Sequence, residues 1–127
     1  AIAVGAADQA KQAGERIPGF GHPYHSPDPR AVALRTLSDS SGISGSACEA
    51  LDNLAAVLAE RSSGRILPNA DGAAAAILLD MSFPPRCGRG FFIIGRSAGL
   101  VAHAMEEEAR ERPIRTIDPD RVTYDGP

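Results

Sequence analysis

The sequence predicts a mainly α-helical protein, and three observations indicate this fold class. Alanine is abundant and aromatic residues make up only 5% of the 127 residues, so close-packed helices explain the core better than a β-sandwich does. Apolar side chains recur at helical spacing in several segments. Clusters of glycine and proline separate these segments from one another. The chain length suits one domain.

The first part of the chain contains two expected helices joined by a stiff loop. Residues 1–12 are rich in alanine, glutamine and lysine, which favour helix, and Gly14 is placed to end this helix as a C-cap. Glycines let the following loop, residues 16–30, turn tightly, and prolines stiffen it. Asp28 and Pro29 then start the second helix, since aspartate is a good N-cap and proline suits the first turn.

The third expected helix begins at a capping box. Ser46-Ala-Cys-Glu49 has the required spacing, with a serine three residues before a glutamate. Leu51, Leu54 and Leu58 follow on one apolar stripe at helical spacing. We therefore expect an amphipathic helix that Ser46 caps, followed by a short linker over residues 61–65.

The second half contains a polar turn and a long apolar segment. The turn, residues 67–72, leads into a helix over about residues 71–81, which the prolines at 84–85 end. Residues 86–108 form either one buried helix, loosened by four glycines, or two pieces. The tail, residues 114–124, alternates weakly and is expected to be extended.

Composition excludes several classes of protein. A net charge of −3 argues against a nucleic-acid partner, which usually needs a basic surface. The longest apolar run is interrupted by Arg96 and His103 and is too short and too polar to span a membrane. Cys48 and Cys87 form no C-x-x-C motif and suit a reducing compartment, and no signal peptide is visible. We expect a cytoplasmic protein.

One short motif suggests an α/β-hydrolase. Gly95-Arg-Ser97-Ala-Gly99 matches the nucleophile-elbow pattern, and an apolar run precedes it. That fold needs an acid and then a histidine after the serine, but His103 is the last histidine and lies in the same helical pattern. No strand–helix alternation precedes the motif. Small residues at close helix packing explain the glycines better.

A metal site is a second alternative. His22 and His25 are three residues apart, and Asp28 is nearby. The prolines of this loop exclude the helical geometry that would align the two histidines on one face. No third soft ligand lies within reach in the sequence. We therefore expect no bound metal.

A third alternative is a site for making or breaking a carbon–carbon bond. His22 would act as an electrophile or hydrogen-bond donor, Asp71 as a base, and arginines would hold carboxylates. Asp71 also fits the N-cap of the helix that it begins. Arg96, inside an apolar run, should be buried or half-buried, either in an internal salt bridge or as a clamp on a substrate carboxylate. The spacing leaves these roles open.

Four segments, in the same order, resemble the citrate synthase family. The resemblance is carried by Ile17-Pro-Gly-Phe-Gly-His22-Pro with Asp28-Pro-Arg30-Ala, by Leu67-Pro-Asn-Ala-Asp71-Gly, by Gly95-Arg96-Ser-Ala-Gly-Leu-Val-Ala-His103, and by Arg112-Pro-Ile-Arg115 with Tyr124-Asp-Gly-Pro. The Gly-His-Pro segment and the alanine-rich stretch after Asp71 look most like citryl-CoA lyase-like members.

The resemblance implies a role for each matching residue. His22 corresponds to the histidine that polarises the keto or hydroxyl oxygen of the oxaloacetate–citrate end, and Asp71 to the base that takes the α-proton of the acyl-CoA thioester. Arg30, Arg96 and Arg115 correspond to arginines that hold carboxylates, with Arg115 reaching the partner subunit's site. It further implies a citrate synthase or citryl-CoA lyase, a homodimer, and a CoA thioester as substrate with no separate cofactor.

The resemblance also implies a domain organisation. Residues 1–85 would form the small helical domain that handles CoA, and residues 86–127 the helix and tail that return to the large domain. The family's other catalytic histidine would precede Ala1, so the chain resembles the C-terminal part of such an enzyme. A module that binds acyl-CoA or a tricarboxylate without turnover remains the alternative, and an α/β-hydrolase is a weaker one.

Overall fold

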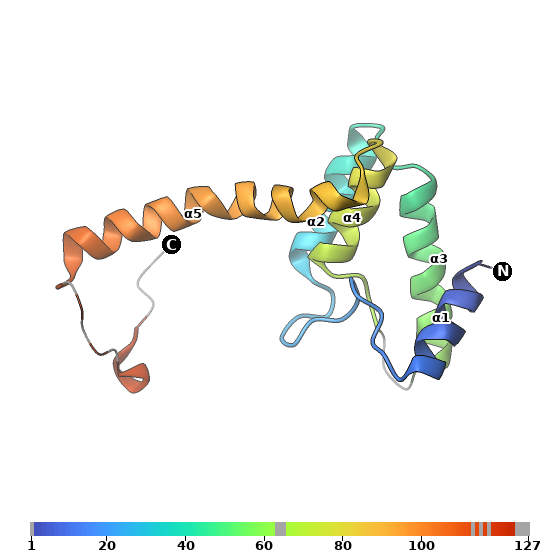
Figure 1. The fold of residues 1–127 in the computed structure, drawn as a ribbon, viewed down its shortest axis with the longest axis horizontal. Coiled ribbons are helices and arrows are strands. Elements are labelled where there is room, and N and C mark those ends of the chain that lie inside the picture. The colour runs from blue at the N-terminus through green and yellow to red at the C-terminus, as the bar shows by residue number, and fades with distance from the viewer. Residues whose placement is uncertain (1, 63–65, 113, 115, 117, 124–127) are drawn as a thin grey trace. The chain divides into compact units, whose positions relative to one another are not determined.

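The computed structural model describes residues 2–62, 66–112, 114, 116 and 118–123. These residues form five α-helices, two short 3-10 helices and no β-strand (Figure 1). The elements are α1 (Ile2–Ala13), α2 (Pro29–Ser40), α3 (Ser46–Arg61), α4 (Ala70–Asp80), η1 (Pro85–Cys87), α5 (Gly88–Arg110) and η2 (Pro119–Arg121). The predicted mainly α-helical fold class is confirmed.

The chain divides into two compact units, residues 1–89 and residues 90–127. In the first unit α4 packs against both α2 and α3, and α1 packs against α3 (Figure 1). The buried residues of α4 are all small: Ala70, Gly72, Ala73 and Ala76. Helices can approach closely where such residues meet, so alanine forms the core, as the composition predicts.

The first two helices begin and end where the sequence predicts. Gly14 follows α1 with a φ of +67°, the left-handed conformation typical of a glycine C-cap. Asp28 is the N-cap of α2, where its side chain accepts a hydrogen bond from the Arg30 N–H, and Pro29 occupies the first turn. The two ends of the proline-rich loop are thereby fixed.

The predicted capping box of α3 is wrong. Gly45 is the N-cap and provides no side-chain cap. The carboxylate of Asp80, at the end of α4, instead accepts hydrogen bonds from the N–H groups of Gly45, Ala47 and Cys48 at 2.8, 2.8 and 3.0 Å. The first N–H groups of a helix need acceptors from outside it, and here a second helix provides them in place of Ser46.

The environment of Asp80 favours its charged form. Burial acts to raise the pKa of this carboxyl, but hydrogen bonds from the Ala47 N–H, the Cys48 thiol and the Gly45 N–H outweigh it and lower the pKa to about 2. Burial, and then the hydrogen bond to Asp80, raise the pKa of the Cys48 thiol. This carboxylate therefore joins α3 to α4 by ionic hydrogen bonds.

Helix α5, which lies in the second unit from Gly90 onward, is one continuous helix of 23 residues, and this settles the alternative of one helix or two pieces. None of its residues is buried. Arg96 is exposed, so the expectation that it is buried or half-buried is wrong. The described part of the second unit contains no other α-helix against which α5 could pack. None of the described helices is both long and apolar enough to cross a membrane.

The tail differs from the predicted extended segment. Residues 119–121 form η2, which the side chain of Asp118 caps by accepting a hydrogen bond from the Asp120 N–H at 3.1 Å. Pro119 occupies the first turn of this short helix. A local Asp-Pro signal thus outweighs the weak alternation of the sequence.

Candidate active site

Backbone hydrogen bonds join the proline-rich loop to the segment that leads into α4. The N–H of Gly21 donates to the carbonyl of Leu67 at 2.8 Å, and the N–H of Asn69 donates to the carbonyl of Gly19 at 2.9 Å. The two segments run antiparallel at this point. They lie more than forty residues apart in the sequence, and this pairing places the segment before His22 beside the segment before the start of α4.

Two glycines allow the loop and α4 to approach this closely. A Cβ at Gly72 would lie 2.3 Å from the carbonyl oxygen of Gly19, and a Cβ at Gly19 would lie 2.8 Å from the Gly72 Cα. Gly19 also has a φ of +85°, which L side chains rarely adopt. Backbone therefore packs directly on backbone at the joint between the two segments.

The His22 ring is oriented by its own loop. Its Nδ1 accepts hydrogen bonds from the backbone N–H groups of Tyr24 and His25, both at 3.1 Å. A nitrogen that accepts carries no proton, so the neutral ring has its proton on Nε2. The half-buried His22 side chain can thus donate a hydrogen bond from Nε2, the chemistry expected from the sequence.

Asp71 is not the N-cap of α4. That role belongs to Asn69, whose Oδ1 accepts from the N–H groups of Asp71 and Gly72 at 3.0 and 3.2 Å. Asp71 is the second residue of the helix, is exposed, and has no side-chain hydrogen bond or ion pair to any other described residue. Its carboxylate is therefore available for another role, which removes the capping alternative.

Asp28 and Arg30 form an ion pair next to the start of α4. The Nε and Nη2 of Arg30 donate to the two carboxylate oxygens of Asp28 at 3.1 and 3.0 Å, and the Ala70 N–H donates to Oδ2 at 2.9 Å. Asp28 is only 2% exposed. The hydrogen bond from Arg30 is the main cause that holds the pKa of this carboxyl well below its usual range. Arg30, whose side chain is 61% exposed, presents the rest of its guanidinium to solvent.

Arg30 and Asp71 also interact electrostatically. The hydrogen bond that Arg30 donates to Asp28 is the largest cause of the raised pKa of Arg30, and the charge of Asp71 raises it further. Two of the predicted site residues, Arg30 and Asp71, thus interact directly, and His22 lies on the loop whose backbone pairs with the segment before α4.

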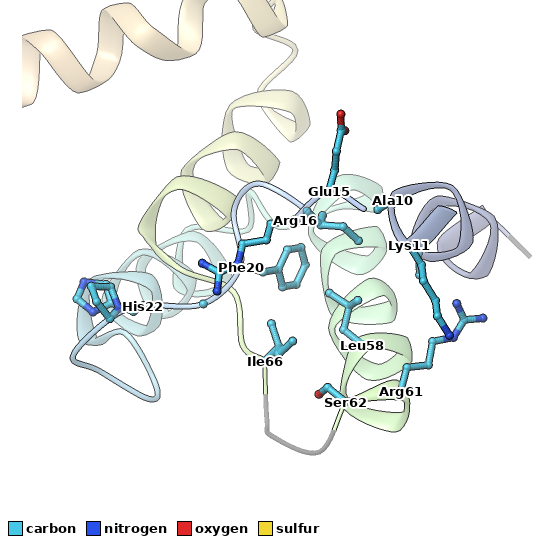
Figure 2. Close-up of a pocket in the computed structure, with 14 residues that line it drawn as sticks. Ala10, Lys11, Glu15, Arg16, Phe20, His22, Leu58, Arg61, Ser62 and Ile66 are labelled. Atoms are coloured by element: carbon cyan, nitrogen blue, oxygen red, sulfur yellow. The ribbon is translucent and has the colours of Figure 1, made fainter. Parts of the chain in front are cut away.

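A cavity of about 570 Å³ borders His22. Figure 2 shows Phe20, Leu58 and Ile66 pointing toward its middle, with His22 at one side. Its other lining residues include Lys11 and three glycine or alanine positions. His22 also lines a second cavity of about 140 Å³, formed with the segment that precedes α4. His22 thus lines both cavities.

Cationic side chains at the larger cavity were not predicted. Lys11, Arg16 and Arg61 line it and come from α1, the loop and α3 (Figure 2). Arg61 also forms an ion pair with Asp8 of α1 at 2.6 Å. These residues lie far apart in the sequence, and the packing of α1 on α3 brings them together. No local sequence motif could therefore indicate this group.

The other two predicted site residues do not belong to the first unit. Arg96 lies on α5 in the second unit, and Arg115 lies outside the described residues. The structure also argues against the hydrolase alternative. Ser97 is inside a continuous helix, where its hydroxyl donates to the Ile93 carbonyl, instead of at a strand-to-helix turn. In the described part of the chain, no three histidine, cysteine or acidic side chains group to hold a metal.

Comparison with known proteins identifies the family. The family model for the citrate synthase C-terminal domain matches residues 3–117. The chain belongs to the citrate synthase family. This confirms the resemblance carried by the four segments, and it assigns the fold to the helical domains of citrate synthase-like proteins.

Individual members of the citrate synthase family differ in the activity that they are named for. Citrate/2-methylcitrate synthase of Bacillus subtilis (strain 168) is 35% identical over 121 residues, which cover 89% of this chain and 30% of that protein. Citryl-CoA lyase of Hydrogenobacter thermophilus aligns with a TM-score of 0.83 at 35% identity, over 98% of this chain and 50% of the lyase chain.

A second similar structure bears on the fold alone. Citrate synthase of Thermotoga maritima MSB8 aligns with a TM-score of 0.70 at 24% identity, over 98% of this chain and 34% of that protein. The chain therefore spans half or less of the length of these citrate synthase family members.

Proposed function

We propose that the protein to which these residues belong forms or cleaves the carbon–carbon bond between the acetyl group of acetyl-CoA and oxaloacetate. The observation that supports this most is the backbone pairing that joins the His22 loop to the start of α4. It holds a hydrogen-bond donor and an uncommitted carboxylate, Asp71, on paired segments. Membership of the citrate synthase family supports the same reaction class.

The reaction divides between these two side chains. Asp71 takes a proton from the methyl carbon of the thioester, and the resulting enolate carbon forms a bond to the keto carbon of oxaloacetate. The keto oxygen gains the electron pair and is stabilised by a hydrogen bond from the Nε2–H of His22, and the proton that Asp71 has taken returns to this oxygen through solvent, which gives citryl-CoA. A synthase then hydrolyses the thioester with water, and a lyase runs the bond-forming steps in reverse.

The larger cavity receives part of the acyl-CoA substrate. It combines apolar side chains, Phe20, Leu58 and Ile66, with the cationic side chains of Lys11 and Arg16. This combination suits a ligand that carries both a flat heterocycle and phosphate groups. Because His22 borders the same cavity, the thioester end of such a ligand can reach the imidazole.

Arginines bind the carboxylates of the second substrate. Arg30 contributes the part of its guanidinium that Asp28 does not occupy, and Asp28 holds the other part in a bidentate pair. Arg96 adds a further contact from the helix that returns to the large domain, and Arg115 acts in the partner subunit's site of a homodimer. The small CoA-handling domain comprises residues 1–85, and residues 86–127 belong to the large domain.

No cofactor beyond the CoA thioester takes part in this scheme. The free thiols of Cys48 and Cys87 suit a cytoplasmic protein.

The test of the proposed function is an assay of the complete protein in both directions. CoA thiol release from acetyl-CoA plus oxaloacetate reports synthesis, and oxaloacetate release from citryl-CoA reports cleavage. Activity in either assay supports the proposal, and the ratio of the two fixes the direction.

The same experiment distinguishes an enzyme from a binding module. A module would bind acetyl-CoA or citrate saturably in a calorimetric titration and show no turnover in either assay. No residue of this sequence matches the family's other catalytic histidine, and the binding alternative rests on this difference. Binding with no turnover would therefore overturn the proposed reaction and leave the ligand class standing.

A further inference from the structure

We propose that Asn69 is a positioning residue that fixes the His22 loop against the start of α4 through both ends of its side-chain amide. The inference rests on the proposed function, because it concerns the geometry of the same site. Asn69 has no place in the chemistry itself. It acts through the backbone on either side of it.

The oxygen end of the amide holds the helix that carries Asp71. Oδ1 accepts from the backbone N–H groups of Asp71 and Gly72 at 3.0 and 3.2 Å. This bond satisfies N–H groups that have no partner inside the helix. It also ties the backbone of Asp71 itself to the Asn69 side chain.

The nitrogen end of the same amide holds the loop that carries His22. Nδ2 donates to the carbonyl of Gly21, the residue directly before His22, at 2.9 Å. The Asn69 backbone N–H adds a second bond, to the carbonyl of Gly19 at 2.9 Å. One residue therefore contacts the backbone next to the donor and the backbone of the base.

Capping alone does not account for an asparagine here. Serine and aspartate cap helices about as well as asparagine does, yet neither carries an N–H₂ group that could reach Gly21. The donor end is the property that asparagine adds. Its bond to Gly21 is the step that makes Asn69 a link between the two elements and not only an end of α4.

This argument defines an experiment on the complete protein. Asn69→Ser keeps a neutral capping oxygen and loses the donor, and Asn69→Asp keeps the cap, loses the donor and adds a charge. The matched control is Asn53→Ser, at an exposed asparagine within α3. For each variant we would measure kcat, KM, the thermal midpoint, and the hydrogen exchange of a peptide covering residues 19–25.

Both Asn69 variants should lower kcat by about tenfold or more, because small losses of alignment between reacting groups have large effects on rate. KM for both substrates should change by less than about threefold, since no binding group is removed. The 19–25 peptide should exchange faster than in the wild-type protein, and Asn53→Ser should match the wild type throughout.

Several outcomes would overturn the inference. One is a lower thermal midpoint with kcat unchanged, which means that Asn69 only stabilises α4. Another is a loss of kcat in Asn69→Asp alone, which attributes the effect to the added charge. A wild-type protein inactive in both directions would refute the proposed function instead, and the exchange comparison would still decide whether Asn69 links the loop to α4.

Discussion

Asp71 lies in the first turn of α4 but does not cap this helix, because Asn69 is the N-cap. This single fact distinguishes two interpretations that the sequence leaves open. An aspartate used as a cap would have its carboxylate occupied by backbone N–H groups. An exposed and unpaired one is available as a base, and it lies close enough to Arg30 to raise the pKa of that side chain.

We expect Asp71→Asn to abolish turnover in the complete protein and leave its fold unchanged. The amide cannot take a proton from a thioester, whereas the loss of one charge near a helix N-terminus costs only about 0.3–1 kcal/mol of stability. Circular dichroism and steady-state rates measure the two effects separately. Unchanged activity would remove Asp71 as the base.

The contact between Gly19 and Gly72 gives a second prediction for single residues. Gly72→Ala should destabilise the protein by roughly 1–3 kcal/mol or more, because the new methyl group would overlap the Gly19 carbonyl oxygen. Gly5→Ala is the control, since a Cβ at that helical position has nothing within 4 Å. It should be neutral or stabilising by up to about 1 kcal/mol. Chemical denaturation measures both, and equal effects would contradict the steric argument.

At the scale of elements, α3 depends on α4 for its N-terminal cap. The carboxyl of Asp80 has a pKa of about 2 against an ordinary value of 3.8, so its hydrogen bonds to α3 contribute fully above about pH 4. This contribution disappears as the pH falls through about 2. The N-terminal end of α3 is therefore sensitive to acid through Asp80, although its own N-cap, Gly45, has no titratable side chain.

We expect Asp80→Asn to lower stability at neutral pH and to flatten the fall in stability between pH 4 and pH 2. Part of the slope should remain, because the pKa of Asp28 is also held below its usual range. Denaturation midpoints at four pH values would provide the slopes. Wild type and variant with parallel slopes would show that this carboxyl is not the group responsible.

Helix α5 presents the opposite case, a long helix with no buried residue. Large apolar side chains along it, including Phe92, Ile94 and Val101, are exposed. In the chain by itself, we expect the amides of α5 to exchange with solvent at least about tenfold faster than those of α4, since few tertiary contacts protect them. In the complete protein they should become protected. Equal protection of both helices in the chain alone would contradict the assignment of α5 to the large domain.

At the scale of the whole molecule, the proposed site needs groups that the first unit does not contain. Arg96→Leu in the complete protein should weaken the binding of oxaloacetate by about 2–4 kcal/mol, as expected for the loss of a charge-assisted pair. Arg89→Leu is the control, because Arg89 lies seven residues earlier on the same helix. The KM for oxaloacetate measures both variants. A negligible change at Arg96 would exclude the carboxylate clamp.

The sequence predicts the parts of this molecule whose signals are local. Asp28-Pro29, Gly14 and the prolines at 84–85 each define a helix boundary within a few residues, and the structure confirms these boundaries. The cap of α3 was missed because its acceptor, Asp80, lies over thirty residues away. Nothing near Ser46 in the sequence points to it.

The same distinction applies to the candidate site. His22, Arg30 and Asp71 could be named in advance because each lies in a recognisable segment. The part played by Asn69 in joining the segments, and the cationic lining of the cavity, depend on how the helices pack. Tertiary contacts of this kind leave no periodic or local pattern in the sequence.

The exchange of backbone hydrogen bonds between residues 19–21 and 67–69 has a practical consequence for protein engineering. If the proline-rich loop were replaced by that of a homologue in order to alter substrate preference, only one of these two hydrogen-bonded segments would be changed. The new loop would then have to form the same backbone hydrogen bonds, and the same glycine contact, with the unchanged segment. Successful chimaeras should therefore carry both stretches from the same parent.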